Sequence, residues 1–189
     1  MAETASLVHA AFNSDDSYST EIKHTMRQTW LWAFTGTLFV PKEGAFIQDY
    51  PETRNGMPFM DQSDLEQKLN ANDPNVRFVP FGYPVGEMTP AQLAQNAYAI
   101  ELAGEEGAEK LAKVAEKFRD IPYLHSFESV DENDTRVSAL YARVRDGEES
   151  EPPGFGNWLI VNAFTRGGNG AGRAFGLVRE TGGASRAEK

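Results

Sequence analysis

Cysteine is absent from the 189 residues of the chain. This absence excludes disulfides, thiolate nucleophiles and zinc or iron–sulfur sites built on cysteine. Basic residues are few, because 18 lysines and arginines stand against 28 aspartates and glutamates, for a net charge of -10. A protein that holds a nucleic-acid backbone needs clustered lysine and arginine, so this charge argues against nucleic acid as the partner.

Long hydrophobic runs are absent as well. The longest uncharged stretch, Gln28 to Pro41, is shorter than the roughly 20 residues that a membrane helix requires. The N-terminal segment carries Glu3 where a signal peptide would carry basic residues. We therefore expect a soluble, cytoplasmic protein, or one assembled into a particle made inside the cell, with no membrane insertion.

The stretch from Thr29 to Val40, TWLWAFTGTLFV, holds the densest group of large apolar side chains in the chain. Its tryptophans and phenylalanines could each bury about 150–250 Å². We interpret residues 30–34 as the end of a helix that starts near Ser19, and residues 37–40 as a strand. Gly36 would join the two, and we expect this junction to form the nucleus of the core.

Capping signals predict the helices of the middle of the chain. Ser63–Glu66 and Thr89–Gln92 both match the capping box, in which a hydroxyl and an acid or amide satisfy free backbone amides. The second of these predicts a helix that reaches about Ala103. Gly104 then interrupts the pattern, and Glu105–Arg119 predicts a further amphipathic helix.

From Ile121 onward the apolar residues recur with a period of two, which is typical of strands. The predicted strands are Tyr123–Val130, Arg136–Arg145, Asn157–Arg166 and Arg173–Glu180. Their short connections favour antiparallel neighbours, so we predict a four-stranded antiparallel meander with Trp158–Val161 as its central strand.

The order of these elements predicts an α+β fold with N-terminal helices and mixed strands, a central helix pair and the C-terminal meander. We expect an N-terminal α/β lobe over residues 1–104, a lobe with a helix and an antiparallel sheet over residues 105–181, and a flexible tail over residues 182–189.

Two motifs resemble ligand loops but lack essential residues. Gly167–Gly172 resembles a phosphate loop, yet a strand pattern follows it instead of a helix, so we interpret it as a hairpin connection. Asp131–Asp134 begins like a calcium loop, but Arg136 stands where that loop needs glycine. We therefore predict no cofactor, no metal site and no catalytic residue from these motifs.

A loop before the predicted central strand is the candidate interaction surface. It carries Glu148, Glu149 and Glu151, and it ends at Phe155 and Trp158. Acidic loops are usually only solvated, and large aromatic residues at a strand boundary are often half-buried, so these alternatives stay open. Exposed aromatic residues in this position would suit a protein interface.

The three histidines, His9, His24 and His125, lie on separate predicted elements, and their spacing matches no metal motif. His125 is flanked by Leu124 and Phe127 on a predicted strand, which makes it the polar site to test. A hydrogen-bonded structural histidine is the alternative.

The chain resembles the N-terminal domain of the SseB family over residues 20–103. The resemblance depends on Leu38–Pro41, on Met57–Asp61, on the short helix around Asp64–Glu66, on Val76–Pro80 and on the helix from Thr89. It implies a small intracellular α/β module with no established catalytic residues.

These observations predict a non-catalytic intracellular protein-interaction, regulatory or assembly subunit that binds a protein partner or forms a homo-oligomer. Two alternatives stay open. One is a structural component of a large particle such as a virion. The other is a small enzyme whose site assembles from dispersed histidine and carboxylate residues.

Overall fold

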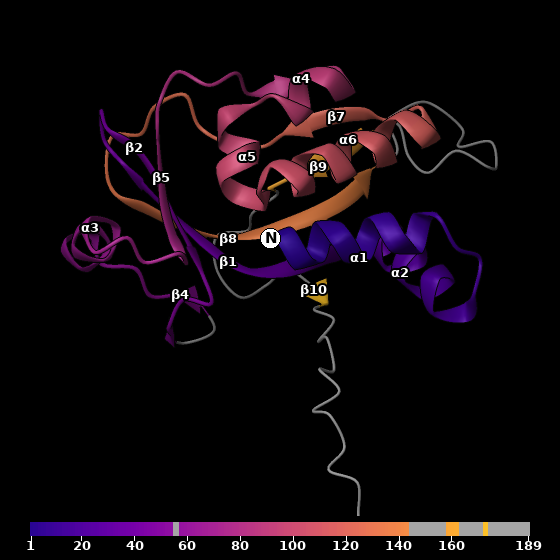
Figure 1. The fold of residues 1–189 in the computed structure, drawn as a ribbon, viewed down its shortest axis with the longest axis horizontal. Coiled ribbons are helices and arrows are strands. Elements are labelled where there is room, and N and C mark those ends of the chain that lie inside the picture. The colour runs from indigo at the N-terminus through magenta and orange to yellow at the C-terminus, as the bar shows by residue number, and fades with distance from the viewer. Residues whose placement is uncertain (55–56, 144–157, 163–171, 174–189) are drawn as a thin grey trace, which may run out of the picture.

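The computed structural model describes residues 1–54, 57–143, 158–162 and 172–173, and it combines helices with one large curled sheet (Figure 1). The helices are α1 (Ala2–Phe12), α2 (Ser17–Gln28), α3 (Gln62–Asn70), α4 (Pro90–Ala94), α5 (Ala97–Ala103) and α6 (Glu105–Phe118). The strands are β1 (Trp30–Val40), β2 (Gly44–Asp49), β3 (Thr53–Arg54), β4 (Met57–Pro58), β5 (Val76–Pro80), β6 (Gly86–Glu87), β7 (Ile121–Leu124), β8 (Asp134–Arg143), β9 (Trp158–Val161) and β10 (Gly172–Arg173). This confirms the α+β class.

The eight-stranded sheet has the order β5-β2-β1-β8-β9-β7-β6, and β10 pairs with the start of β1. β1 pairs antiparallel with β2 on one side and with β8 on the other, and its first residues pair parallel with β10. A single strand therefore connects the N-terminal part of the chain to its last described strands.

The prediction that residues 30–34 close a helix was wrong. α2 ends at Gln28, and Thr29 already has an extended backbone with φ of -156° and ψ of 177°. β-branched and aromatic side chains favour the extended state, and burial alternates from Trp30 to Ala33 as in a strand. Gly36 accordingly lies within β1, where it pairs with Gln48.

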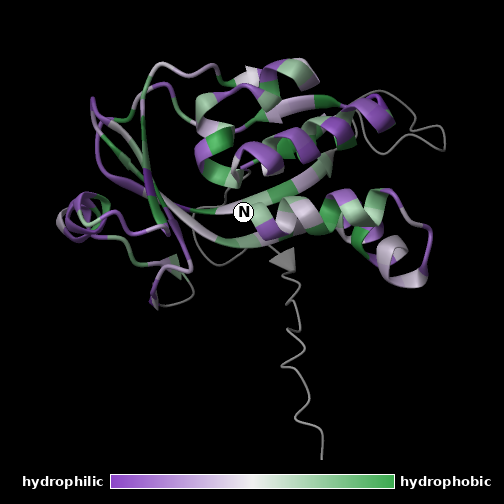
Figure 2. Ribbon diagram, in the orientation of Figure 1, coloured by the Kyte–Doolittle hydropathy of each residue, from purple (hydrophilic) through white to green (hydrophobic). Residues whose placement is uncertain are grey.

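Two hydrophobic clusters lie on opposite faces of the sheet. The larger cluster packs β1, β2 and β7–β9 against α1, α2 and α4–α6 (Figure 1). The smaller cluster lies under α3 and contains Leu38, Val40, Phe46, Met60, Leu65 and Val76. Figure 2 shows hydrophobic and hydrophilic residues alternating along α6, as expected for a helix with one face on the sheet.

Only part of the aromatic stretch is interior. Phe39 is fully buried, Trp30 and Trp32 are half-buried, and Phe34 is 57% exposed. The expectation that this whole segment lies inside the folded body therefore holds for the second half of β1 and fails at Phe34.

The antiparallel meander also requires correction. β8 and β9 are antiparallel neighbours as predicted, but β7 lies on the far side of β9 and runs parallel to it, with Ile121 opposite Trp158. β8 instead pairs with β1, whose long edge offers more hydrogen bonds than β7 can. The connection from Leu124 to Asp134 is long enough to bypass β9, which lies between β7 and β8 in the sheet. The prediction failed there because it assumed that consecutive strands with short connections are neighbours.

Smaller corrections concern the helices. The helix predicted from Thr89 to Ala103 divides at Asn96, whose side chain caps α5, although the capping box of Thr89 and Gln92 is confirmed. The cap of α3 is Asp61, not Ser63, because the Asp61 carboxylate accepts from the backbone N–H of Asp64.

The sheet and the larger core cluster include residues from both sides of Gly104, the expected boundary between two lobes. The two parts therefore share one sheet and one core. Of the helices within the described ranges, the longest has 14 residues, and none is long and apolar enough to cross a membrane.

We expect Gly44→Ala to destabilise the protein by about 3 kcal/mol or more, because a Cβ at Gly44 would lie 2.1 Å from the Val79 carbonyl oxygen of β5. Gly82→Ala is the matched control. Gly82 also has a positive φ, of 112°, but nothing lies within 4 Å of its Cβ position. Urea denaturation should show a much larger loss for Gly44→Ala, and equal losses would contradict the proposed clash.

Candidate functional site

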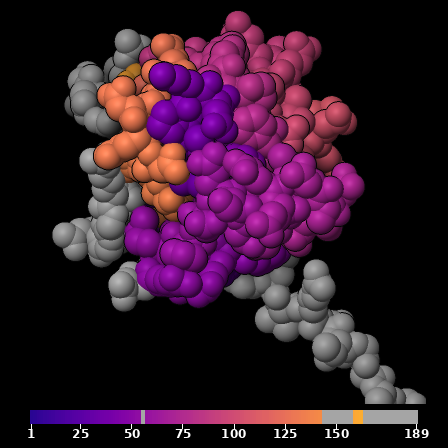
Figure 3. Space-filling view, turned by 90° about the vertical axis from the view of Figure 1, so that its left-hand side faces the viewer, coloured from indigo at the N-terminus to yellow at the C-terminus, as the bar shows by residue number. Residues whose placement is uncertain are grey.

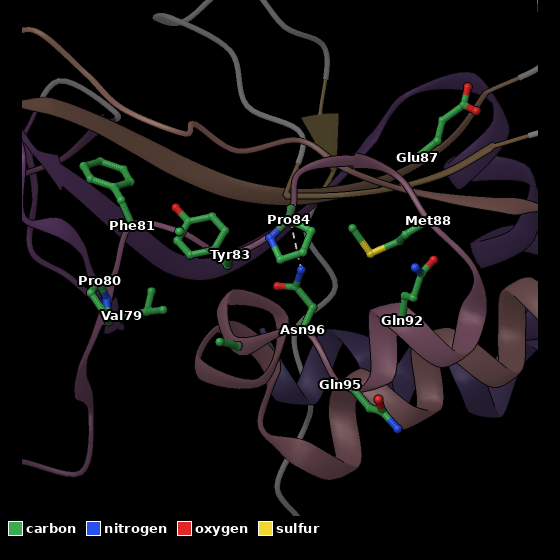
Figure 4. Close-up of a pocket in the computed structure, with 12 residues that line it drawn as sticks. Val79, Pro80, Phe81, Tyr83, Pro84, Glu87, Met88, Gln92, Gln95 and Asn96 are labelled. Carbon is green, nitrogen blue, oxygen red and sulfur yellow. Dashed lines mark hydrogen bonds between the residues drawn. The ribbon is translucent and has the colours of Figure 1, made fainter.

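A pocket of about 510 Å³ lies between the end of β5 with the link that follows it and the segment that runs from β6 to the start of α5 (Figure 4). β5 and β6 are the two ends of the strand order, yet only residues 81–85 separate them in the chain. Because a residue spans at most about 3.6 Å, this link holds the end of β5 within about 20 Å of the start of β6. The pocket, which we call the Tyr83 pocket, is lined by Val79, Pro80, Phe81, Gly82, Tyr83, Pro84, Glu87, Met88, Gln92, Gln95, Asn96 and Ala97.

Local capping interactions hold the helical wall of the Tyr83 pocket. The Thr89–Gln92 box starts α4 and engages the Gln92 side chain, which accepts a hydrogen bond of 2.8 Å from the Thr89 backbone. Asn96 accepts from the backbone N–H groups of Tyr98 and Ala99, and its Nδ2 donates to the Pro84 carbonyl at 2.8 Å. Figure 4 shows this last bond joining the helical wall to the opposite loop.

The floor of the Tyr83 pocket is aromatic and its rim is polar. Tyr83 and Met88 are buried, and the Tyr83 ring lies 4.8 Å from that of Tyr98 and 6.4 Å from that of Phe81. Gln92 and Gln95 are exposed at the rim. An apolar floor with a few amide groups suits an apolar or aromatic ligand group that also makes hydrogen bonds.

A buried polar network lies behind this floor. The Tyr98 hydroxyl accepts from Asn162 Nδ2 at 2.7 Å and lies 3.2 Å from the Thr37 hydroxyl. The Tyr83 hydroxyl bonds to Ser126 at 3.0 Å. The network thus ties α5 and the pocket floor to β1 and to the residue after β9.

Burial keeps both tyrosines protonated. It raises the pKa of Tyr98 far above its usual value and raises the pKa of Tyr83 to about 12, the latter against the opposing effect of its bond to Ser126. At neutral pH neither phenol can act as a base or as a nucleophile. The pocket floor therefore offers hydrogen bonds and ring contacts, but no reactive oxygen.

His125, the predicted polar site, lies beside this network and is not among the residues that line the pocket. Its backbone N–H donates to the Val161 carbonyl at 2.9 Å, and its carbonyl accepts from Asn162 at 3.3 Å. Burial, and then the charge of Arg136, lower the pKa of His125. The ring is thus neutral at pH 7, as in a structural histidine.

The other predicted site residues fall in two groups. Glu148, Glu149, Glu151 and Phe155 lie outside the described residues. Trp158 starts β9 and is half-buried, with its ring 5.8 Å from that of Tyr123. The structure thus describes only one member of the predicted interaction surface.

Metal binding was not predicted, and the described part of the chain contains no cluster of three or more His, Asp or Glu residues that could hold an ion. The histidines lie on α1 (His9), on α2 (His24) and after β7 (His125).

Sequence reasoning missed the Tyr83 pocket. Its clearest signal is the Phe81-Gly82-Tyr83-Pro84 turn, which leads to the strong capping box at Thr89. Aromatic residues within a turn, directly before a well-capped helix, form a rigid cluster of the kind that lines ligand sites.

Comparison with known proteins identifies a fold but no family. No family model matches the chain, and no curated protein matches it. One solved structure matches the chain with a TM-score of 0.51 and 16% sequence identity, over 85% of this chain and 80% of that one. It is described with the words "Accommodation of massive sequence variation in Nanoarchaeota by the C-type lectin fold". The fold is C-type lectin-like. At this identity the similarity concerns the C-type lectin fold alone, and the resemblance to the SseB family stays a prediction.

We expect Tyr98→Phe to lower the free energy of unfolding by about 1–3 kcal/mol, because it leaves the buried groups of Asn162 and Thr37 without their shared partner. Tyr83→Phe, the control, should cost less, since its partner Ser126 is only half-buried. Urea unfolding measures both, and an equal or smaller loss for Tyr98→Phe would contradict the importance of the network.

The lowered pKa of His125 predicts a pH effect on stability. The unfolded histidine, with a pKa of 6.5, takes up a proton before the folded one does, so stability should fall as the pH drops below about 6.5. His125→Gln should therefore flatten the change in melting temperature between pH 7.5 and pH 5. His24→Gln is the control, because His24 is exposed on α2, and an unchanged pH profile in His125→Gln would refute the assignment.

Proposed function

We propose that this chain is a non-catalytic protein-interaction, regulatory or assembly subunit that acts inside the cell and binds a protein partner through the Tyr83 pocket. The observation that carries the proposal is the chemistry of the pocket lining. None of its 12 residues is a serine, cysteine, lysine or histidine, and its one phenol has a raised pKa. Such a lining can bind an apolar side chain, and its one carboxylate, that of Glu87, is exposed and has no serine, cysteine, lysine or histidine beside it in the lining to form a catalytic pair.

The polar rim supports a peptide as the ligand. The exposed amide of Gln95 can donate to and accept from a backbone that lies across the pocket, and the Gln92 amide, whose oxygen already accepts from Thr89, can donate to it. An apolar side chain would enter toward Tyr83 and Met88. Interfaces commonly combine a buried anchor residue with such a polar rim.

We expect Ala97→Trp to weaken binding of the protein partner or of a second copy by about tenfold to a hundredfold, because the indole would occupy the space of the anchor side chain. Ala97 is exposed and lines the Tyr83 pocket. Ala91→Trp is the matched control, since Ala91 is also exposed on a neighbouring helix but does not line the pocket.

Native mass spectrometry and pull-down with the wild-type chain and both variants provide the measurement, with circular dichroism to check folding. A wild-type chain that stays a lone monomer and recovers no partner would contradict the proposal. Equal binding by Ala97→Trp and Ala91→Trp would place the interface elsewhere and refute the role of the Tyr83 pocket.

A further inference from the structure

An exposed aromatic ring interrupts the most buried strand of the sheet. Phe34 is 57% exposed, whereas every residue from Thr35 to the end of β1 is buried. The pairing of β1 with β8 shifts register between Trp32 and Gly36, so Phe34 lies at an irregular position. Bulges of this kind redirect side chains and are common beside functional sites.

A second irregularity exposes a second ring beside it. Tyr50 directly follows β2, has a φ of 52° and is 59% exposed. Left-handed backbone is unusual for a bulky residue, and such strain persists where neighbouring contacts fix it, often at functional positions. Here the Tyr50 backbone N–H donates to the Phe34 carbonyl at 2.7 Å.

The two rings form one surface, which we call the Phe34–Tyr50 platform. Their centroids lie 6.3 Å apart with an interplanar angle of 21°, within the range of offset stacking. The Tyr50 hydroxyl donates to the carboxylate of Glu3 on α1, which fixes the ring from its far end. Two backbone irregularities and one side-chain bond therefore hold two large apolar rings at the surface.

Charge complementarity indicates what binds there. Glu3 contacts the platform and is exposed, whereas Glu52 pairs with Arg54, and Asp49 pairs with the Met1 ammonium and with Arg77. The Glu3 carboxylate is therefore the group at the platform that a cation would complement. The faces of aromatic rings attract cations, and the planar guanidinium of arginine both stacks on rings and pairs with carboxylates.

The same region already contains this arrangement within the chain. The Arg54 guanidinium lies 3.3 Å above the Phe59 ring, and its Nε lies 3.3 Å from the Glu52 carboxylate. Figure 3 shows the side of the molecule that carries β3, β4 and α3, the segments directly after Tyr50, in purple and magenta. An arginine stacked between ring and acid is thus compatible with the local geometry and charge.

We propose that the Phe34–Tyr50 platform binds an arginine side chain of a protein partner. The guanidinium stacks on an exposed ring face, and the carboxylate of Glu3 accepts its hydrogen bonds. This inference adds a second contact surface to the proposed function, and it names the chemistry that the partner must carry there.

The test uses the full chain and a glycine-flanked triarginine peptide, titrated by calorimetry against the same peptide with citrulline, the neutral isostere of arginine. We expect the arginine peptide to bind at least tenfold more tightly. Phe34→Ala and Tyr50→Gly should each weaken its binding by about tenfold. Tyr18→Ala should leave it unchanged, because Tyr18 is an exposed tyrosine on α2 that is not part of the platform.

Tyr50→Gly also separates binding from folding. Glycine accepts the left-handed backbone without strain, so the melting temperature should not fall although the ring is lost. A marked fall in the melting temperature would show that the Tyr50 ring stabilises the fold. It would contradict the inference that the left-handed backbone at Tyr50 serves binding.

Several outcomes would overturn the proposal. These are equal affinity for the citrulline peptide, unchanged affinity in both platform variants, an equal loss in Tyr18→Ala, or binding of a neutral oligosaccharide such as maltoheptaose in place of the arginine peptide. Ala97→Trp should keep full affinity for the arginine peptide, so failure of the Tyr83 pocket and failure of the platform can be told apart.

Discussion

The short link over residues 81–85 is the constraint on which the candidate site depends. It joins β5 and β6, the two ends of the strand order, and so allows the sheet to curl but not to open flat. A twisted sheet has curvature of its own, and the link adds a limit on how far its edges can separate. The pocket forms in the remaining gap, with Tyr83 from the link as its floor.

The interior behind this gap is polar and held in uncharged form. Tyr98 meets Thr37 and Asn162 at full burial, so its phenol stays protonated, and burial also disfavours a charge on His125. A buried network of neutral groups fixes the relative positions of the helix, the strand and the loop that meet there. These groups act there as hydrogen-bond partners.

The similarity to a C-type lectin fold at 16% identity illustrates how loosely side-chain identity determines this architecture. In this chain a central strand pairs on both edges and helices cover one face of the sheet, and many apolar combinations satisfy such an arrangement. Function depends on sites carried by the fold. In this chain the candidate sites coincide with departures from regularity, namely the register shift around Phe34, the left-handed Tyr50 and the link that carries Tyr83.

The sequence by itself determined the features that depend on neighbours within a few residues. The capping box at Thr89, the break at Gly104 and the helix that follows were all predictable, because their hydrogen bonds close over three or four positions. Only the tertiary structure decided that residues 30–34 extend β1, that β9 runs parallel to β7, and that Tyr83 and Asn96 line one pocket. Those outcomes depend on strand pairing and edge-to-edge distance between segments far apart in the chain, where local periodicity carries no information.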